Sequence, residues 1–108
     1  MSDESPLVEV VRNDLEDRYE IHVGDQLAGF AQYRDEGDRR VFFHTEISTL
    51  FEGRGLGTVL ALHAVEETIA QGKKIVPTCP FIAAWLRRHP DYEPHVLWSE
   101  ATEAGNPA

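Results

Sequence analysis

Apolar and polar residues alternate along the first half of the chain, which is the period of half-buried strands. Short polar linkers, NDLED, GDQ and EGD, separate the alternating segments and are suited to tight turns. The segments are LVEVVRND, RYEIHV, LAGFAQYRD and RRVFFHTEI. The pattern therefore predicts an antiparallel meander of four strands.

The period changes after residue 51, where apolar residues begin to recur at intervals of three and four. This spacing predicts an amphipathic helix over residues 57–71, which Gly72 ends. Its expected inner stripe consists of Val59, Leu62, Val65 and Ile69, widened by Leu60 and Ala61. We therefore expect this helix to pack on one face of the meander.

The last part of the chain predicts a strand, a second helix and a further strand. KKIVPTC is typical of a short buried strand, and Pro77 indicates that this strand is an edge, or ends or bends there. PFIAAWLRRH predicts a helix with Pro80 at its first position and Pro90 after its end. The inner face of this helix is expected to be Ile82, Trp85 and Leu86, and YEPHVLW is expected to return as a last strand.

The predicted fold class is α+β, with a mixed, mostly antiparallel sheet of five to six strands and two main helices. With 108 residues, the chain has the length of one domain. We place that domain at residues 7–98 and expect disordered tails at 1–6 and 99–108, where small and polar residues dominate.

Cysteine content and hydropathy narrow the class of protein. Cys79 is the sole cysteine, so no internal disulfide and no cysteine-based zinc site can form. The acidic N-terminus has no apolar segment, and no run of residues reaches the length of a membrane span. We expect a cytoplasmic protein without a membrane partner.

The net charge of −9 argues against nucleic-acid binding, because neutralising phosphates requires a basic surface. An acidic domain can instead attract a cationic small molecule or a lysine-bearing protein. Solubility alone is the simpler explanation for most of these charges.

Three glycines, Gly53, Gly55 and Gly57, stand at the start of the first helix. The first amides of a helix lack intrahelical acceptors and carry partial positive charge, so they bind anions. Glycine lets a ligand approach the backbone closely. The turn therefore predicts a phosphate site with Arg54 as a charged clamp. The alternative is that the glycines only shape a tight connection.

Two common phosphate-binding motifs do not match this turn. A Walker loop needs a lysine before a serine or threonine, whereas Thr58 follows Gly57. The dinucleotide fingerprint needs a third glycine where Leu60 stands, and it belongs to a unit opened by a parallel strand. Neither motif therefore identifies a ligand for this turn.

The order of elements and three stretches of sequence resemble the GNAT N-acetyltransferase superfamily. Its phosphate loop has the pattern Q/R-x-x-G-x-G/A, and EGRGLG, residues 52–57, matches both glycines but has glutamate at the first position. The chain is most similar to the small single-domain branch called Yjdj-type, through HTEI, GRGLGTVLALHAVE and GKKIVPTCPFIAAWLRRHPDY. The likeness extends from about residue 7 to residue 95.

This resemblance implies a site for acetyl-coenzyme A where the fourth strand, residues 41–47, diverges from the fifth, residues 75–78. It implies that the loop amides hold the pyrophosphate and that the pantetheine runs beside the fourth strand. The expected loop contacts are Arg54, Gly55, Gly57 and Thr58. The residues expected to flank the pantetheine are Glu46, Ile47 and Ser48.

A base is needed if an amine attacks the thioester, because an amine with a pKa near 10.4 is protonated at neutral pH. Its deprotonation costs roughly 4 to 5 kcal/mol. His44 and Glu46 are two positions apart on a strand, so they share a face and can act together as the base. The alternatives are a half-buried structural histidine and a carboxylate that caps nearby amides.

Cys79 directly precedes Pro80, so it is expected at the N-terminus of the second helix, where the helix field lowers the pKa of a thiol. Two mechanisms stay open: an acetyl-cysteine intermediate with ping-pong kinetics, or direct transfer with Cys79 only lining the site. Direct transfer is usual in the superfamily. Tyr92 corresponds to a tyrosine that protonates the leaving thiolate in many relatives, but it lies beyond Pro90.

The sequence thus predicts an acetyl-coenzyme A-dependent N-acetyltransferase acting on a primary amine of a small molecule or protein. The alternative is a module that binds coenzyme A or acyl-coenzyme A without turnover, as a sensor or subunit. The catalytic residues expected are Glu46, Cys79 and His44. The sequence identifies neither the acceptor nor the oligomeric state.

Overall fold

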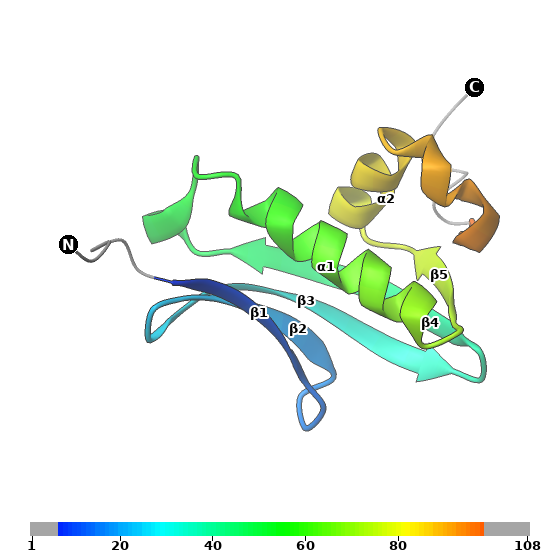
Figure 1. Cartoon of the computed structure of the whole chain (residues 1–108), viewed down its shortest axis with the longest axis horizontal. Helices are drawn as coiled ribbons and strands as arrows, with labels where there is room; N and C mark the ends of the chain where they lie inside the picture. The colour runs from blue at the N-terminus through cyan, green and yellow to red at the C-terminus, as the bar shows by residue number, and fades with distance from the viewer. Residues whose placement is uncertain (1–6, 99–108) are drawn as a thin grey trace.

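A computed structural model describes residues 7–98, and the expected tails at 1–6 and 99–108 lie outside them (Figure 1). Five strands and two helices make up the fold, joined in part by short 3₁₀ segments. The strands are β1 (Val8–Asn13), β2 (Arg18–Val23), β3 (Gln26–Glu36), β4 (Arg39–Ile47) and β5 (Lys74–Pro77). The other elements are η1 (Thr49–Phe51), α1 (Leu56–Ala70), α2 (Pro80–Arg87) and η2 (Pro90–His95).

The sheet has the order β1-β2-β3-β4-β5, which confirms the predicted meander and the mixed, mostly antiparallel sheet. The first four strands pair antiparallel, and β5 pairs parallel with β4. The β4–β5 ladder is short because it extends only to the pair Phe42 and Pro77. The Phe42 carbonyl then accepts the amides of both Thr78 and Cys79, each at 3.0 Å. Beyond this point β4 continues to Ile47, while the segment that follows β5 turns into α2. The two segments therefore diverge.

The last strand predicted at YEPHVLW is wrong. Residues Pro90–His95 form the 3₁₀ segment η2, and a single bridge between Ile75 and Val96 is what remains of strand pairing. Pro90 and Pro94 have no amide to donate to a ladder, and their fixed φ favours the tight turn over an extended strand. The sheet of the described residues therefore has five strands, the lower of the two expected numbers.

Both helices contribute to one hydrophobic core, which lies on one face of the sheet. In Figure 1, α1 crosses the sheet and α2 lies beside it. The buried residues of α1 are Leu56, Leu60, Ala61, Ala64, Val65 and Thr68. In α2, Ile82, Trp85 and Leu86 are buried as predicted. Within residues 7–98, neither helix has the length and hydropathy that crossing a membrane requires.

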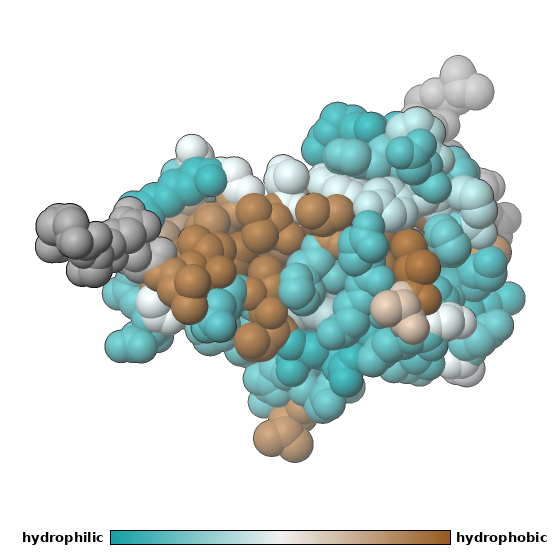
Figure 2. Space-filling model, viewed as in Figure 1, coloured by the Kyte–Doolittle hydropathy of each residue, from teal (hydrophilic) through white to brown (hydrophobic). Residues whose placement is uncertain are grey.

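The predicted inner stripe of α1 is partly wrong, because Val59 and Leu62 are 43% and 44% exposed. Leu60, Ala61 and Val65 are buried as predicted, and Ala64, which the stripe did not include, is buried with them. Figure 2 shows apolar surface over the N-terminal half of α1 and the start of β1. Periodicity alone did not distinguish this flank of the helix from the buried face.

Cross-strand pairing assigns each side chain of β3 and β4 to a face of the sheet. Ala31 pairs with Thr45 and Gly29 pairs with Ile47, on the face that the helices cover. The alternate pairs, Phe30 with Glu46 and Gln32 with His44, lie on the opposite face. We call this second face, carried by Arg18, Glu20, His22, Phe30, Gln32, His44 and Glu46, the open face.

A buried guanidinium joins the sheet to α1. Arg40 is 3% exposed, and its Nε and Nη2 donate to the Asp35 carboxylate at 2.7 and 2.9 Å. Its Nη1 donates to the Tyr19 hydroxyl at 2.6 Å, which in turn donates to Glu67 of α1 at 2.7 Å. The hydrogen bonds from Arg40 lower the pKa of Asp35. This chain of polar contacts fixes how α1 lies on the sheet.

Glu20 is the centre of a second network, on the open face. Burial alone would raise its pKa, but hydrogen bonds from Asn13, His22 and Arg18 outweigh that effect and lower the pKa to about 2. The donor–acceptor distances are 2.9, 2.9 and 2.8 Å respectively. Ionised Glu20 thus ties β1 to β2 by satisfied hydrogen bonds.

We predict that Glu20→Gln destabilises the protein in a pH-dependent way. A depressed folded-state pKa stabilises the fold above the unfolded-state pKa, and this stabilisation is lost as pH falls from about 4.5 toward 2. Urea unfolding should show a loss of about 2 to 3 kcal/mol at pH 7 and roughly half of that at pH 3. Glu36→Gln, in an exposed pair with Arg34, should cost about 0 to 1 kcal/mol at both pH values. A loss at Glu20 that does not change with pH would contradict the assignment.

Candidate functional site

The loop between β4 and α1 brings backbone rather than side chains to the start of the helix. Gly53 and Gly55 have φ angles of 83° and 74°, in the left-handed region that favours glycine. A Cβ atom at either position would meet nothing within 4 Å, so both positions are open. Gly55 is the N-cap of α1 and offers no side chain to bond the first amides. The loop therefore leaves the N-terminus of α1 accessible.

The amides of residues 53–58 have no intramolecular acceptor in the described part of the chain. The first amide to bond back is that of Val59, which donates to the Gly55 carbonyl at 3.4 Å. Unpaired amides at the positive end of a 15-residue helix form an anion site. Gly55, Gly57 and Thr58 thus offer unpaired amides, and their role in binding a diphosphate stays a prediction.

A hollow of about 270 Å³ opens in front of this loop. The Phe81 ring, from the first turn of α2, closes one side of it by packing on Gly57. A Cβ atom at Gly57 would lie 2.7 Å from Phe81 Cζ, so the ring occupies the space that a side chain would take. The lining residues are Ile47, Phe51, Glu52, Gly53, Gly55, Leu56, Gly57, Thr58 and Phe81.

The two charged side chains of the loop differ in their placement. The Arg54 guanidinium carbon lies 5.2 Å from the centre of the Phe51 ring, so this cation stacks beside the hollow without being part of its lining. Glu52 does line the hollow, and its carboxylate opposes an anion there. Recognition of an anion must therefore rest on the amides.

His44 and Glu46 come together on the open face, as their spacing predicted. His44 Nε2 lies 2.7 Å from Glu46 Oε2, and the two side chains are 46% and 59% exposed. The Phe30 ring lies beside this pair, tilted by 51° to the His44 ring with centroids 6.1 Å apart. An exposed carboxylate with an imidazole partner can accept a proton from a group arriving from solvent.

Cys79 lies at the N-cap of α2, as predicted, but its side chain does not cap the helix. The thiol is 3% exposed and donates to Thr45 Oγ1 at 3.3 Å. Thr45 was missed by sequence reasoning. Its signal was available, because Thr45 alternates with His44 and Glu46 and so must lie on the helix-covered face of β4.

Glu46 and Cys79 therefore flank the divergence of β4 and β5 from opposite faces of the sheet. Ile47 follows Glu46 into the hollow before the loop, whereas Ser48 caps η1, where its Oγ accepts the Leu50 amide at 3.3 Å. The structure brings His44 to Glu46 and Cys79 to Thr45, and it does not join these two pairs.

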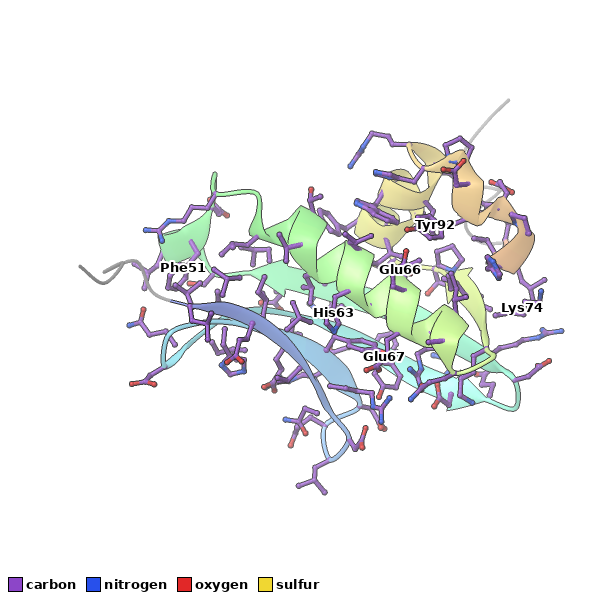
Figure 3. All side chains as sticks on the ribbon, in the orientation of Figure 1. Phe51, His63, Glu66, Glu67, Lys74 and Tyr92 are labelled. Atoms are coloured by element: carbon purple, nitrogen blue, oxygen red, sulfur yellow. The ribbon has the colours of Figure 1, made fainter. Side chains whose placement is uncertain are left out.

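Tyr92 and Arg87 are engaged elsewhere. The Tyr92 hydroxyl donates to Glu66 of α1, and this hydrogen bond, together with burial, raises the Tyr92 pKa (Figure 3). Its ring packs against Trp85 in a tilted arrangement, with centroids 5.5 Å apart. The Arg87 guanidinium lies over the Trp98 ring at 4.8 Å. Both side chains therefore join the C-terminal segment to the helices.

Comparison with known proteins identifies the family. The sequence model of the family described as GCN5-related N-acetyl-transferase matches residues 18–95. The chain belongs to this family. The match includes the glycine loop, β4, Cys79 and both helices, so every candidate site residue lies within the matched region.

A solved structure supports the fold of this GCN5-related N-acetyltransferase. The solution structure of a GCN5-like candidate N-acetyltransferase from Staphylococcus aureus superimposes with a TM-score of 0.66 and 23% sequence identity. The alignment covers 85% of this chain and 90% of that one. No curated protein sequence matches the chain. The narrower assignment to the Yjdj-type branch stays a prediction.

We predict that Gly55→Ala destabilises the protein more than Gly55→Asn does. The left-handed conformation of Gly55 costs an alanine about 1 to 2 kcal/mol, whereas asparagine adopts it more readily. Urea unfolding of the two variants beside the unmodified protein measures the difference. Equal stability of all three would show that the loop relaxes away from this conformation.

Proposed function

We propose that the protein transfers an acetyl group from acetyl-coenzyme A to a primary amine of a small molecule or protein. The observation that carries this proposal is the set of unpaired amides at the N-terminus of α1, next to the point where β4 and β5 diverge. Family membership supports acetyl transfer in general. Acetyl-coenzyme A supplies the reactive thioester when it is bound.

Four residues hold the diphosphate in this proposal. Gly55, Gly57 and Thr58 donate backbone amides, and Arg54 moves from the Phe51 ring to add a charge-assisted hydrogen bond. Hydrogen bonds to a charged group contribute roughly 1.5 to 3 kcal/mol each. Several such bonds outweigh the unfavourable Glu52 carboxylate. The open space at Gly53 and Gly55 fits a ligand that approaches the backbone.

The divergence of β4 and β5 supplies the channel for the rest of the cosubstrate. Beyond Phe42, the β4 backbone on this side has no β5 partner, so it is available to the amide groups of a pantetheine. Ile47 provides an apolar wall in the hollow, and Ser48 lies at the following position. We assign both residues to this part of the site.

Glu46 acts as the general base, with His44 as its partner. Glu46 takes a proton from the acceptor ammonium, and the 2.7 Å contact with His44 orients the carboxylate. Both groups are exposed, so the proton can pass to solvent. Removing the proton from the acceptor ammonium costs roughly 4 to 5 kcal/mol at neutral pH, and the base lowers this contribution to the barrier.

Of the two mechanisms, direct transfer with Cys79 as a lining residue has the better support. The thiol is buried, donates to Thr45, and lies on the face opposite Glu46, so the amine and the thiol approach the divergence from different sides. In the alternative, the Cys79 thiolate attacks the thioester, forms acetyl-cysteine and releases the coenzyme thiolate, and the amine then takes the acetyl group. Burial with one hydrogen-bond partner favours Cys79 as part of the lining.

We predict coenzyme A release with at least one member of a panel of amines and lysine peptides. Glu46→Gln should lower kcat by about 10²-fold or more, because it removes the base. The control Glu36→Gln changes an exposed carboxylate of β3 and should leave kcat unchanged. Cys79→Ala should retain turnover under direct transfer.

Three results would contradict parts of this proposal. Unchanged turnover in Glu46→Gln would remove the assigned base. Acetylated protein detected by intact-mass analysis, and lost in Cys79→Ala together with turnover, would establish the acetyl-cysteine route. If acetyl-coenzyme A raises the Tm but no amine causes coenzyme release, the protein is a binding module.

A further inference from the structure

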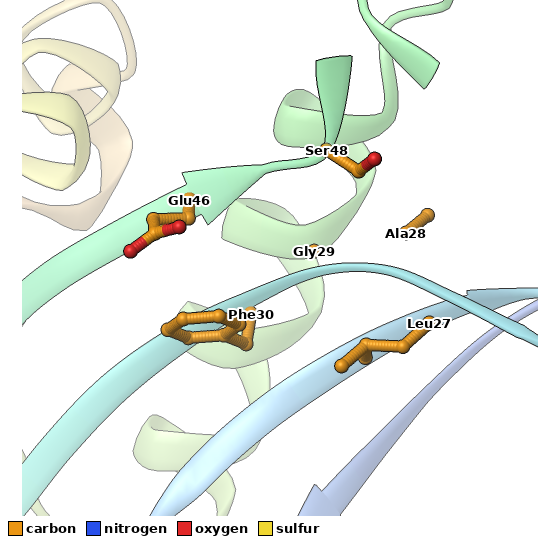
Figure 4. Close-up of a pocket in the computed structure, with 6 residues that line it drawn as sticks. All are labelled: Leu27, Ala28, Gly29, Phe30, Glu46 and Ser48. Carbon is orange, nitrogen blue, oxygen red and sulfur yellow. The ribbon is translucent and has the colours of Figure 1, made fainter. Parts of the chain in front are cut away.

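A second hollow, of about 150 Å³, lies on the open face at the ends of β3 and β4 (Figure 4). It is separate in its lining from the hollow before the glycine loop. Its lining residues are Leu27, Ala28, Gly29, Phe30, Glu46 and Ser48. The proposed general base therefore forms part of a cavity whose other walls are mostly apolar.

Beside this hollow, β3 and β4 pack closely. A Cβ atom at Gly29 would lie 2.5 Å from both the Glu46 carbonyl oxygen and Ile47 Cδ1, so only glycine lets β3 approach β4 here. Ser48 extends the contact, because its amide donates to the Ala28 carbonyl at 2.7 Å. The side chains of Leu27, Phe30 and Glu46 are left to enclose the space, as Figure 4 shows.

The lining has one charge and that charge is negative. Glu46 is 59% exposed, and His44 contacts it from outside the hollow. A cation beside the hollow is Arg18, whose guanidinium carbon lies 4.6 Å from the centre of the Phe30 ring. Arg18 is itself paired with Glu20 at 2.8 Å, so its charge is compensated within the network of the open face. The hollow therefore favours a cation over an anion.

We propose that this hollow binds the acceptor, and that the acceptor is a primary amine on a short apolar stem. The stem packs between Leu27 and Phe30, and the ammonium reaches Glu46. Phe30 and Glu46 are direct cross-strand partners, so their Cβ atoms lie about 4.5 to 5.5 Å apart and one short ligand can contact both. This inference rests on the proposed function, because it takes Glu46 as the base.

The placement gives the two substrates separate entrances. The hollow before the glycine loop is bounded by α1 and α2, and the acceptor hollow lies on the opposite face of β4. An amine seated against Phe30 reaches the divergence of β4 and β5 from the open face. Apolar stems gain from leaving water at Leu27 and Phe30, whereas hydroxylated stems do not.

Steady-state kinetics with n-butylamine, phenethylamine and ethanolamine test this proposal. The two apolar amines should have kcat/KM values at least fivefold above that of ethanolamine. Leu27→Gln should raise the KM for n-butylamine at least fivefold and leave the KM for acetyl-coenzyme A unchanged. Leu62→Gln is the matched control, because Leu62 is 44% exposed, close to the 39% of Leu27, but lies on α1. It should change neither KM.

Comparison of n-butylamine with a lysine-containing peptide distinguishes a free amine from a protein side chain, and in either case Leu27→Gln must raise the KM of the better substrate. An unchanged KM in Leu27→Gln, or equal kcat/KM for all three amines, would overturn the proposal. If the protein shows no turnover, n-butylamine can be titrated into the coenzyme A complex and followed by amide NMR. This measurement tests binding of the acceptor separately from the proposed transfer. Shifts at Leu27 and Phe30 would support the acceptor site, and their absence would overturn it.

Discussion

The structure depends on one constraint: within residues 7–98, the amides that begin α1 are left without acceptors, beside a sheet that opens at the same point. Both features come from the backbone. Gly53 and Gly55 adopt left-handed conformations that direct the chain into α1 without a capping side chain. Pro77 ends β5, and the amides of Thr78 and Cys79 share the Phe42 carbonyl as the chain turns into α2. The electropositive end of a helix therefore lies next to a stretch of β4 that has no partner on the β5 side.

Contacts elsewhere in the fold hold the start of α1 in place beside the divergence of β4 and β5. Arg40, buried between Asp35 and Tyr19, links the sheet to Glu67 on α1, so the helix cannot rotate without breaking charge-assisted hydrogen bonds. At the other end of the helix, Phe81 packs on Gly57 and positions α2 against the loop. The Arg40 hydrogen bonds and the contact of Phe81 with Gly57 thus hold α1 and the glycine loop in position.

Sequence reasoning recovered the features that depend on local pattern. Alternation predicted the four-stranded meander, and the three glycines predicted the loop with its free amides. The expected last strand is absent from the described residues because Pro90 and Pro94 favour a 3₁₀ turn. The prediction gave more weight to the neighbouring apolar residues than to these two prolines. The face of α1 was misjudged in part, because Ala64, which is weakly hydrophobic, is buried while Val59 and Leu62 are exposed.

The arrangement across β4 could not be read from spacing alone. The pairing of His44 with Glu46 followed from the strand period, but the position of Cys79 relative to them depended on how β5 leaves the sheet. That exit places Cys79 on Thr45, on the face away from Glu46. The hollow on the open face likewise combines residues of β3 and β4 with Ser48, a tertiary arrangement that strand alternation does not show.

The central claim is that the unpaired amides at the start of α1 bind the diphosphate of coenzyme A. Titration of the labelled protein with coenzyme A, followed by amide NMR, tests it most directly. The account predicts saturable shifts at the amides of Gly55, Leu56, Gly57 and Thr58, and no such shifts with pantetheine, which has no phosphate. Saturable binding of coenzyme A that leaves these four amides unshifted would contradict it.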